Sequence, residues 1–201
     1  MSKVFTALSV SVDGYITGGD PGAGRGLGDA TMLFDWYFNG DTTPVEGSGF
    51  EMTTASAAYV GETWARIGAL VIGRRLFDLM NGWDGQPPTG DHVVVVSHRP
   101  GPDGWHPEAP YHFVGDVAAA VKKAVQLAGD RVVAVAAGNV GGQALAEGLV
   151  DEVAMDVVPV VFGSGRRYFG ELEGQHLLED ADVVVRGERV LHLRYRVRRK
   201  G

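Results

Sequence analysis

Four consecutive valines at positions 93–96 constrain the fold more than any other feature of this sequence. Valine is branched at Cβ and favours strands, and an unbroken apolar run indicates a strand that is buried on both faces. Apolar runs at residues 69–72 and 132–136 share this character, and segments with helical spacing lie between the three runs. The sequence therefore predicts an α/β fold with a largely parallel sheet.

Further elements extend this pattern at both ends of the chain. Residues 3–12 form an apolar strand that ends at Asp13-Gly14. Two late strands, near residues 177–186 and 188–198, join around Gly187 as a hairpin and make the sheet mixed. Other strands are expected at residues 111–114 and 151–162, and a turn at 138–142. Helices are expected at residues 30–38, 53–66, 74–80, 117–128 and 141–147. Thr53 or Thr54 would cap the second helix, which has Ile67 on its apolar face, and Asp116 would cap the fourth.

Length and composition favour a single domain over residues 1–201. Apolar residues make up 45% of the chain and charged residues 21%, as in proteins with a packed core. The absence of cysteine excludes disulfides and thiolate metal sites, and the six histidines show no metal-ligand spacing. No apolar run approaches the about 20 residues of a membrane helix. A net charge of −7 argues against nucleic-acid binding. Because the chain also lacks cysteine, we expect a cytoplasmic protein. Together these features predict no membrane, metal or nucleic-acid partner.

Polar segments follow the three buried strands at the point where each one ends. Gly73-Arg74-Arg75 follows the first strand, Ser97-His98-Arg99 the second, and the glycine-rich residues 138–142 the third. Each segment alone is more often an ordinary solvated loop. If the strands are parallel neighbours, however, the segments meet at one edge, where α/β sheets bind ligands. Arginines there suit the 2′-phosphate of NADP, and a glycine-rich helix start suits a pyrophosphate.

Six motifs in order resemble those of the RibD C-terminal domain family, the riboflavin-pathway reductases that belong with dihydrofolate reductases. They lie at residues 9–16, 71–78, 94–100, 138–145, 148–152 and 159–165. The resemblance implies a dihydrofolate reductase-like three-layer αβα fold with a mixed, mostly parallel sheet and a C-terminal hairpin. It also implies a homodimer and NADPH-dependent hydride transfer to a pterin-like, pyrimidine-like or flavin-precursor heterocycle. Residues 163–167 are interpreted as a tight turn on the substrate side.

The resemblance also assigns the cofactor-binding residues. Ala7 and Ile16 would flank the nicotinamide. The chain departs from dihydrofolate reductases at Leu76, where they carry a threonine whose hydroxyl helps to hold the cofactor. The phosphates would lie near Gly73, Arg74, Arg75, Ser97, His98 and Arg99, and the pyrophosphate and nicotinamide side near Gly138, Asn139, Val140, Gly141, Gly142 and Gln143.

Two aspartates are candidate proton donors. Asp13 follows the first strand, although an Asp-Gly pair is also a common turn. Asp35 lies in an aromatic segment, residues 34–38, which is similar to the aspartate-bearing helix of dihydrofolate reductases without aligning cleanly. The neighbouring rings could stack on a heterocycle or belong to the core. Two other functions stay open: a nucleotide-binding sensor or partner module that has lost the reaction, and a flavin-binding protein.

Overall fold

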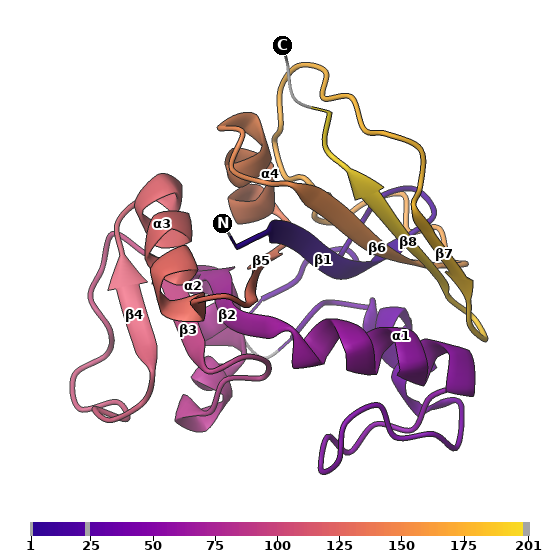
Figure 1. Cartoon of the computed structure of the whole chain (residues 1–201), viewed down its shortest axis with the longest axis horizontal. Helices are drawn as coiled ribbons and strands as arrows, with labels where there is room; N and C mark the ends of the chain where they lie inside the picture. The colour runs from indigo at the N-terminus through magenta and orange to yellow at the C-terminus, as the bar shows by residue number, and fades with distance from the viewer. Residues whose placement is uncertain (1, 23–24, 199–201) are drawn as a thin grey trace.

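The computed structural model describes residues 2–22 and 25–198, and an eight-stranded sheet lies at its centre (Figure 1). The strands follow the order β4-β3-β2-β5-β1-β6-β8-β7. The first six in this order are parallel, whereas β8 is antiparallel to β6 and β7 to β8. The mixed, mostly parallel sheet and its closing hairpin are therefore confirmed. The strands are β1 (Val4–Ser11), β2 (Ile67–Gly73), β3 (His92–Val96), β4 (Tyr111–Val114), β5 (Val132–Ala136), β6 (Glu152–Val158), β7 (Val183–Arg186) and β8 (Leu191–Arg196).

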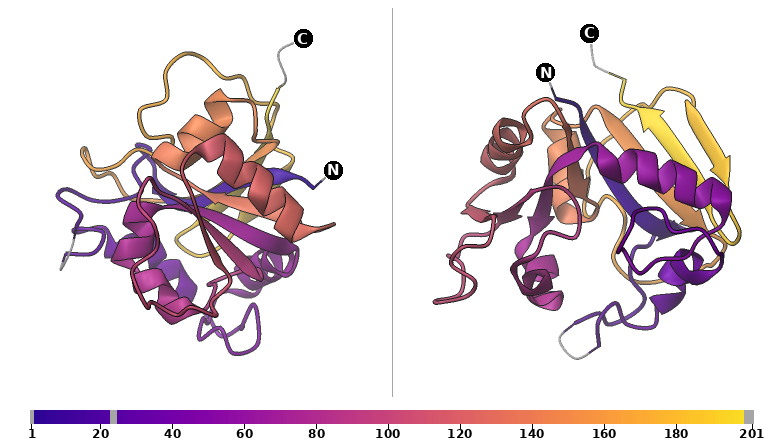
Figure 2. Two further views of the ribbon diagram at one scale, coloured as in Figure 1. Left: turned by 90° about the vertical axis from the view of Figure 1, so that its left-hand side faces the viewer. Right: turned by 60° about the horizontal axis from the view of Figure 1, so that its bottom comes forward.

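Helices cover both faces of the sheet. On one face lie α3 (Val117–Ala128) and α4 (Asn139–Ala146), as Figure 2 shows. The opposite face is covered by α1 (Thr54–Ala65), α2 (Arg74–Leu79) and the 3₁₀ helix η1 (Thr31–Phe38), while a second 3₁₀ helix, η2 (Asn81–Gly85), follows α2. This arrangement confirms the three-layer αβα fold. No helix in the described residues has the length and apolar character that crossing a membrane requires.

The valine strand is buried as its sequence predicts. Val93, Val94 and Val95 are completely inaccessible to solvent. Val94 packs in the core beneath α3, while Val93 and Val95 face Phe77 of α2 on the other side. Alternate side chains of β3 thus join two separate cores, which is why the strand carries no polar residue in its middle.

Side-chain caps fix the starts of two helices. The Asp116 carboxylate accepts a hydrogen bond from the Ala119 amide at 2.7 Å, so α3 begins where its sequence predicts. Thr53 caps α1 in the same way through the Ser56 amide. Both helices then turn an apolar stripe toward the sheet.

Several predicted boundaries are wrong by a few residues. Helix α4 begins at Asn139, inside the predicted turn, because Gly138 alone makes the reversal with a φ of +89°. Strand β6 ends at Val158 rather than at residue 162, since Pro159 has no amide hydrogen for the ladder. The predicted helix at 30–38 is a 3₁₀ helix, and the hairpin strands are shorter than predicted. Ile67, predicted on a helix face, begins β2.

Candidate functional site

The three polar segments meet along one edge of the sheet. Strands β3, β2 and β5 are parallel neighbours, so their carboxyl ends lie side by side. A cavity of about 930 Å³ opens there, which we call the strand-end cavity. Its wall includes eight of the predicted cofactor residues: Ile16, Gly73, Arg74, Arg75, Arg99, Gly138, Asn139 and Val140.

Arg74 is fixed at one end of this cavity. Its Nε donates to Asp78 Oδ1 at 2.7 Å, and its Nη1 donates to the Pro100 carbonyl at 2.9 Å and to Ser97 Oγ at 3.3 Å. The guanidinium also lies over the rings of Phe77 and Phe113. With its side chain only 19% exposed, Arg74 places a positive charge at a defined point on the rim.

Two further arginines line this cavity with different freedom. Arg75 donates to the Pro21 carbonyl at 2.5 Å and so ties α2 to the loop after β1. Arg99 is 71% exposed, and its Nη2 lies 3.6 Å from Asp78 Oδ2, which leaves its guanidinium able to turn toward a ligand. A phosphate at this end would therefore meet both a fixed and a movable guanidinium.

The Ser97 hydroxyl is engaged in shaping the turn after β3. It donates to the Arg99 carbonyl at 2.7 Å and accepts from the Arg99 amide at 3.1 Å. His98 is exposed at the tip of this turn. Neither residue is part of the cavity wall, so their predicted contact with a phosphate stays a prediction.

The glycines of residues 138–142 serve two different purposes. Gly138, with its positive φ, donates its amide to the Tyr168 carbonyl at 2.6 Å and lines the cavity. A Cβ at Gly141 would lie 2.9 Å from the Ala136 carbonyl oxygen, and one at Gly142 would lie 2.0 Å from that of Phe169. These two glycines let α4 pack closely, and the helix meets the cavity through Asn139 and Val140. Gln143 is exposed on the next turn.

Apolar side chains also line the cavity. Leu8 comes from β1, Ile16 from the loop after β1, and Leu76 from α2. Leu76 stands where dihydrofolate reductases carry a threonine, so its side chain offers the cavity no hydroxyl group. Ala7 is half-buried in a cluster with Phe5 on the α1 side and is not part of the cavity wall. Its predicted contact with a nicotinamide is therefore untested.

Asp13 is bound by its own surroundings. Its Oδ1 accepts from Ser11 Oγ at 2.6 Å, and its Oδ2 accepts from the amides of Gly163 at 2.7 Å and Phe162 at 3.2 Å. The Ser11 hydroxyl, followed by these amides, lowers the pKa of the Asp13 carboxyl from its ordinary value of 3.8. The carboxylate is therefore ionised at neutral pH and joins the turn after β1 to the loop after β6.

Asp35 lies on η1, exposed and outside the cavity wall, so no contact supports its predicted role. Its neighbour Trp36 is 1% exposed and donates from Nε1 to Ser9 Oγ at 3.0 Å. Tyr37 stacks on Trp36 with 4.1 Å between ring centroids. Of the two interpretations of this aromatic segment, the structure favours the core for Trp36 and Tyr37.

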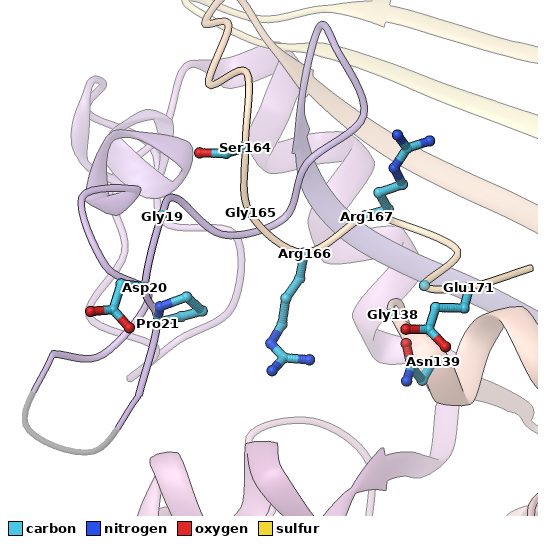
Figure 3. Close-up of a pocket in the computed structure, with 11 residues that line it drawn as sticks. Gly19, Asp20, Pro21, Gly138, Asn139, Ser164, Gly165, Arg166, Arg167 and Glu171 are labelled. Carbon is cyan, nitrogen blue, oxygen red and sulfur yellow. The ribbon is translucent and has the colours of Figure 1, made fainter.

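A second cavity, of about 580 Å³, adjoins the first and involves Arg166, which the sequence analysis places in a turn and does not assign to the cofactor site. We call it the side cavity; Figure 3 shows its wall, which includes Asn139, Ser164 and Arg166. Arg166 belongs to both cavities. Arg167 also lines the side cavity, but it does not reach the strand-end cavity. The signal in the sequence is the pair Arg166-Arg167 within a glycine-containing turn, and a pair of arginines in a loop does not reveal which one lines both cavities.

Comparisons with known proteins agree with this fold. A family model described as the RibD C-terminal domain matches residues 2–192. A putative riboflavin biosynthesis protein from Shewanella sp. PV-4 superposes with a TM-score of 0.67 at 22% identity, over 98% of this chain and 99% of that one. RibD from Acinetobacter baumannii gives 0.61 at 14% identity, over 98% of this chain and 58% of RibD, so this chain spans little more than half of RibD.

A pyrimidine reductase-like protein from Corynebacterium diphtheriae gives a TM-score of 0.60 at 13% identity, over 99% of this chain and 93% of that one. No curated protein sequence matches the chain. At these identities the structural matches establish the shared fold, and the match to the family model covers nearly the whole chain.

Proposed function

Because the chain belongs to the RibD C-terminal domain family of riboflavin-pathway reductases, we propose that it binds NADPH and reduces a small heterocyclic substrate. The observation that carries this proposal is the strand-end cavity. Its wall presents Arg74 and Arg75 from α2, Arg99 from the turn after β3, and the start of α4. An extended ligand with a phosphate at one end and a pyrophosphate further along matches this distribution of positive charge.

The residues of the cavity suit each part of such a ligand. Arg74 and Arg99 supply the charges for the 2′-phosphate that distinguishes NADPH from NADH. The start of α4 supplies amides without helical partners for the pyrophosphate. Leu8 and Ile16 form an apolar wall that excludes water from a flat ring.

When bound, NADPH supplies the hydride, and the protein contributes orientation. Ile16 and Gly138 both line the cavity, and a Cβ at Gly138 would lie 3.4 Å from Ile16 Cδ1, so a side chain at Gly138 would lie against Ile16. The substrate class, a pterin-like, pyrimidine-like or flavin-precursor ring, follows from the family resemblance.

The decisive binding experiment replaces both Arg74 and Arg99 with alanine. Two charge-assisted contacts to one phosphate contribute about 3 kcal/mol together, so we expect NADPH affinity to fall roughly 100-fold and NADH affinity to change little. Isothermal titration calorimetry measures both. Arg198→Ala is the control, since Arg198 pairs with Glu179 in the C-terminal strand region. Equal losses for NADPH and NADH would refute the assignment of the 2′-phosphate.

A second candidate function, a nucleotide-binding protein that does not catalyse the reduction, is favoured by one observation. The Asp13 carboxylate already accepts hydrogen bonds from three donors of the protein, and Asp35 lies outside the cavity wall. Neither aspartate is thus placed to deliver a proton to a bound ring. Loss of NADPH absorbance with a panel of heterocycles separates the two functions, because a binding module leaves NADPH unconsumed.

We also propose that the chain pairs with a second copy of itself, as the family resemblance implies. The C-terminal hairpin supports this, because β7 ends the sheet and Val184 and Leu177 are each 62% exposed beside it. An apolar edge strand of this kind favours pairing with another strand. Light scattering on the wild type and on Val184→Lys tests the proposal, and a monomeric wild type would refute it.

A further inference from the structure

Arg166 lies where the two cavities join. The strand-end cavity and the side cavity share four residues, namely Pro21, Gly138, Asn139 and Arg166. Gly138 and Asn139 begin α4 on one side of this junction, and Arg166 extends from the loop after β6 on the other. Building on the proposed function, we propose that Arg166 binds the pyrophosphate of the dinucleotide opposite the start of α4.

The backbone at Arg166 is held firmly in place. Its amide donates to Thr17 Oγ1 at 2.9 Å, and its carbonyl accepts from the Ile16 amide at 2.8 Å. Two residues later, the Tyr168 carbonyl accepts from the Gly138 amide, which connects this loop directly to the start of α4. The origin of the Arg166 side chain is therefore fixed relative to both walls of the junction.

The two neighbouring arginines point in different directions. In Figure 3 the Arg166 side chain extends into the space between Pro21 and Asn139, whereas the Arg167 side chain points away from it. The Arg167 guanidinium lies over the Tyr15 ring, 5.9 Å from its centroid. Arg166 is exposed, so its guanidinium can reach a ligand at little cost in protein packing. The chain thus provides a control with the same charge at the adjacent position.

Charge complementarity favours the pyrophosphate as the group that Arg166 binds. A helix start carries about half a positive charge, which is less than the two negative charges of a pyrophosphate require. Arg74 and Arg99 serve the 2′-phosphate in our proposal, and Arg75 donates to the Pro21 carbonyl. Two acids also line the side cavity, Asp20 and Glu171, and Asp20 is paired with Arg25. Arg166 is the cation whose side chain enters the junction from the loop facing α4.

The test compares Arg166→Ala and Arg166→Lys with Arg167→Ala by calorimetry. The ligands are NADPH, NADH and adenosine 2′-monophosphate, which has the terminal phosphate and no pyrophosphate. We expect Arg166→Ala to weaken NADPH and NADH by the same factor, roughly tenfold, and to leave the monophosphate unchanged. Arg166→Lys should recover part of the loss, and Arg167→Ala should bind like the wild type.

The pattern of losses identifies each failure separately. Unchanged dinucleotide binding in Arg166→Ala, or a loss shared with Arg167→Ala, overturns the assignment of Arg166 while NADPH binding stands. If only the KM of a reduced heterocycle rises, Arg166 binds an anionic group of the substrate and the assignment is also overturned. If the wild type binds neither dinucleotide, the proposed function itself fails. Thermal unfolding of each variant verifies that all of them are folded.

Discussion

The two halves of the sheet bury different kinds of side chain. One half, β4-β3-β2-β5, which we call the apolar half, has an apolar interior, in which Ile72 and Val94 are fully buried. The other half, β1-β6-β8-β7, which we call the polar half, buries polar groups such as Ser9 and His192. Among the described residues, the buried polar side chains all belong to this second half, to α1 or to the loop after β1. Polar side chains therefore lie at the rim of the apolar half, within reach of a ligand. In the polar half they lie in the interior, where they connect secondary-structure elements.

His192 is the centre of the polar half. Its Nδ1 lies 2.6 Å from Asp156 Oδ1, and its Nε2 lies 2.9 Å from Ser56 Oγ. Serine, histidine and aspartate in this order also form the triad of many hydrolases. Here Ser56 is only 1% exposed and His192 is completely buried, so no substrate can reach the serine. The three residues instead join α1 to β8 and β6, which makes this network part of the frame of the protein.

Replacing His192 with alanine should have the largest effect. The change leaves Asp156 and Ser56 without their buried partner, and removing one member of such a network costs about 3 kcal/mol. Urea unfolding measures the loss of stability. If the polar half is a frame, the folded variant should still bind NADPH as the wild type does. A loss of NADPH affinity together with unchanged stability would contradict the division into two halves.

Val94→Ala tests the apolar half by the same measurement. Val94 is fully buried between the sheet and α3, so removing two methyl groups should cost about 2 kcal/mol through lost burial and a residual cavity. Val161→Ala is the matched control, because Val161 is 69% exposed in the loop after β6 and its truncation should cost less than about 0.5 kcal/mol. Equal losses for the two valines would show that β3 is less tightly packed than its burial indicates.

Ser56→Ala isolates one hydrogen bond of the polar half. The His192 ring keeps Asp156 but loses its partner at Nε2, which costs about 1 kcal/mol in a buried site. The urea midpoint should fall by less than in His192→Ala. The exposed Ser164→Ala provides a baseline. If Ser56→Ala is as damaging as His192→Ala, the serine rather than the histidine is the centre of the network.

The sequence predicts the apolar half better than the polar half, for a physical reason. Consecutive valines at 93–96 and the arginines at strand ends are local patterns, so β3 and the rim follow from nearby residues. The network joins Ser56 to His192 across 136 residues, and no local pattern specifies that pairing. Gly142 is similar: the glycine-rich helix start suggests contact with a pyrophosphate, but a Cβ at Gly142 would lie 2.0 Å from the Phe169 carbonyl oxygen. Which arginine of the 166–167 pair lines both cavities also depends on the folded loop.

Asp13→Asn has the smallest expected effect and tests a contact at the rim of the polar half. The carboxylate holds the amides of Phe162 and Gly163 at the start of the loop that carries Arg166. Because its pKa is lowered in the folded state, chiefly by the Ser11 hydroxyl, it adds stability above its unfolded pKa and loses it as the pH falls through the folded pKa.

The thermal midpoint of the wild type should therefore exceed that of Asp13→Asn at neutral pH, and the gap should shrink below pH 3.8. Because Asp13 is exposed, water screens these contacts and the gap should be small at any pH. Glu179→Gln is the control, since the pKa of Glu179 is also lowered, by Arg198, far from the loop after β6. Weaker NADH binding in Asp13→Asn alone would show that this carboxylate helps to position Arg166. If the difference in thermal midpoint persists in acid, the Asp13 side chain stabilises the fold through packing and uncharged hydrogen bonds rather than through its charge.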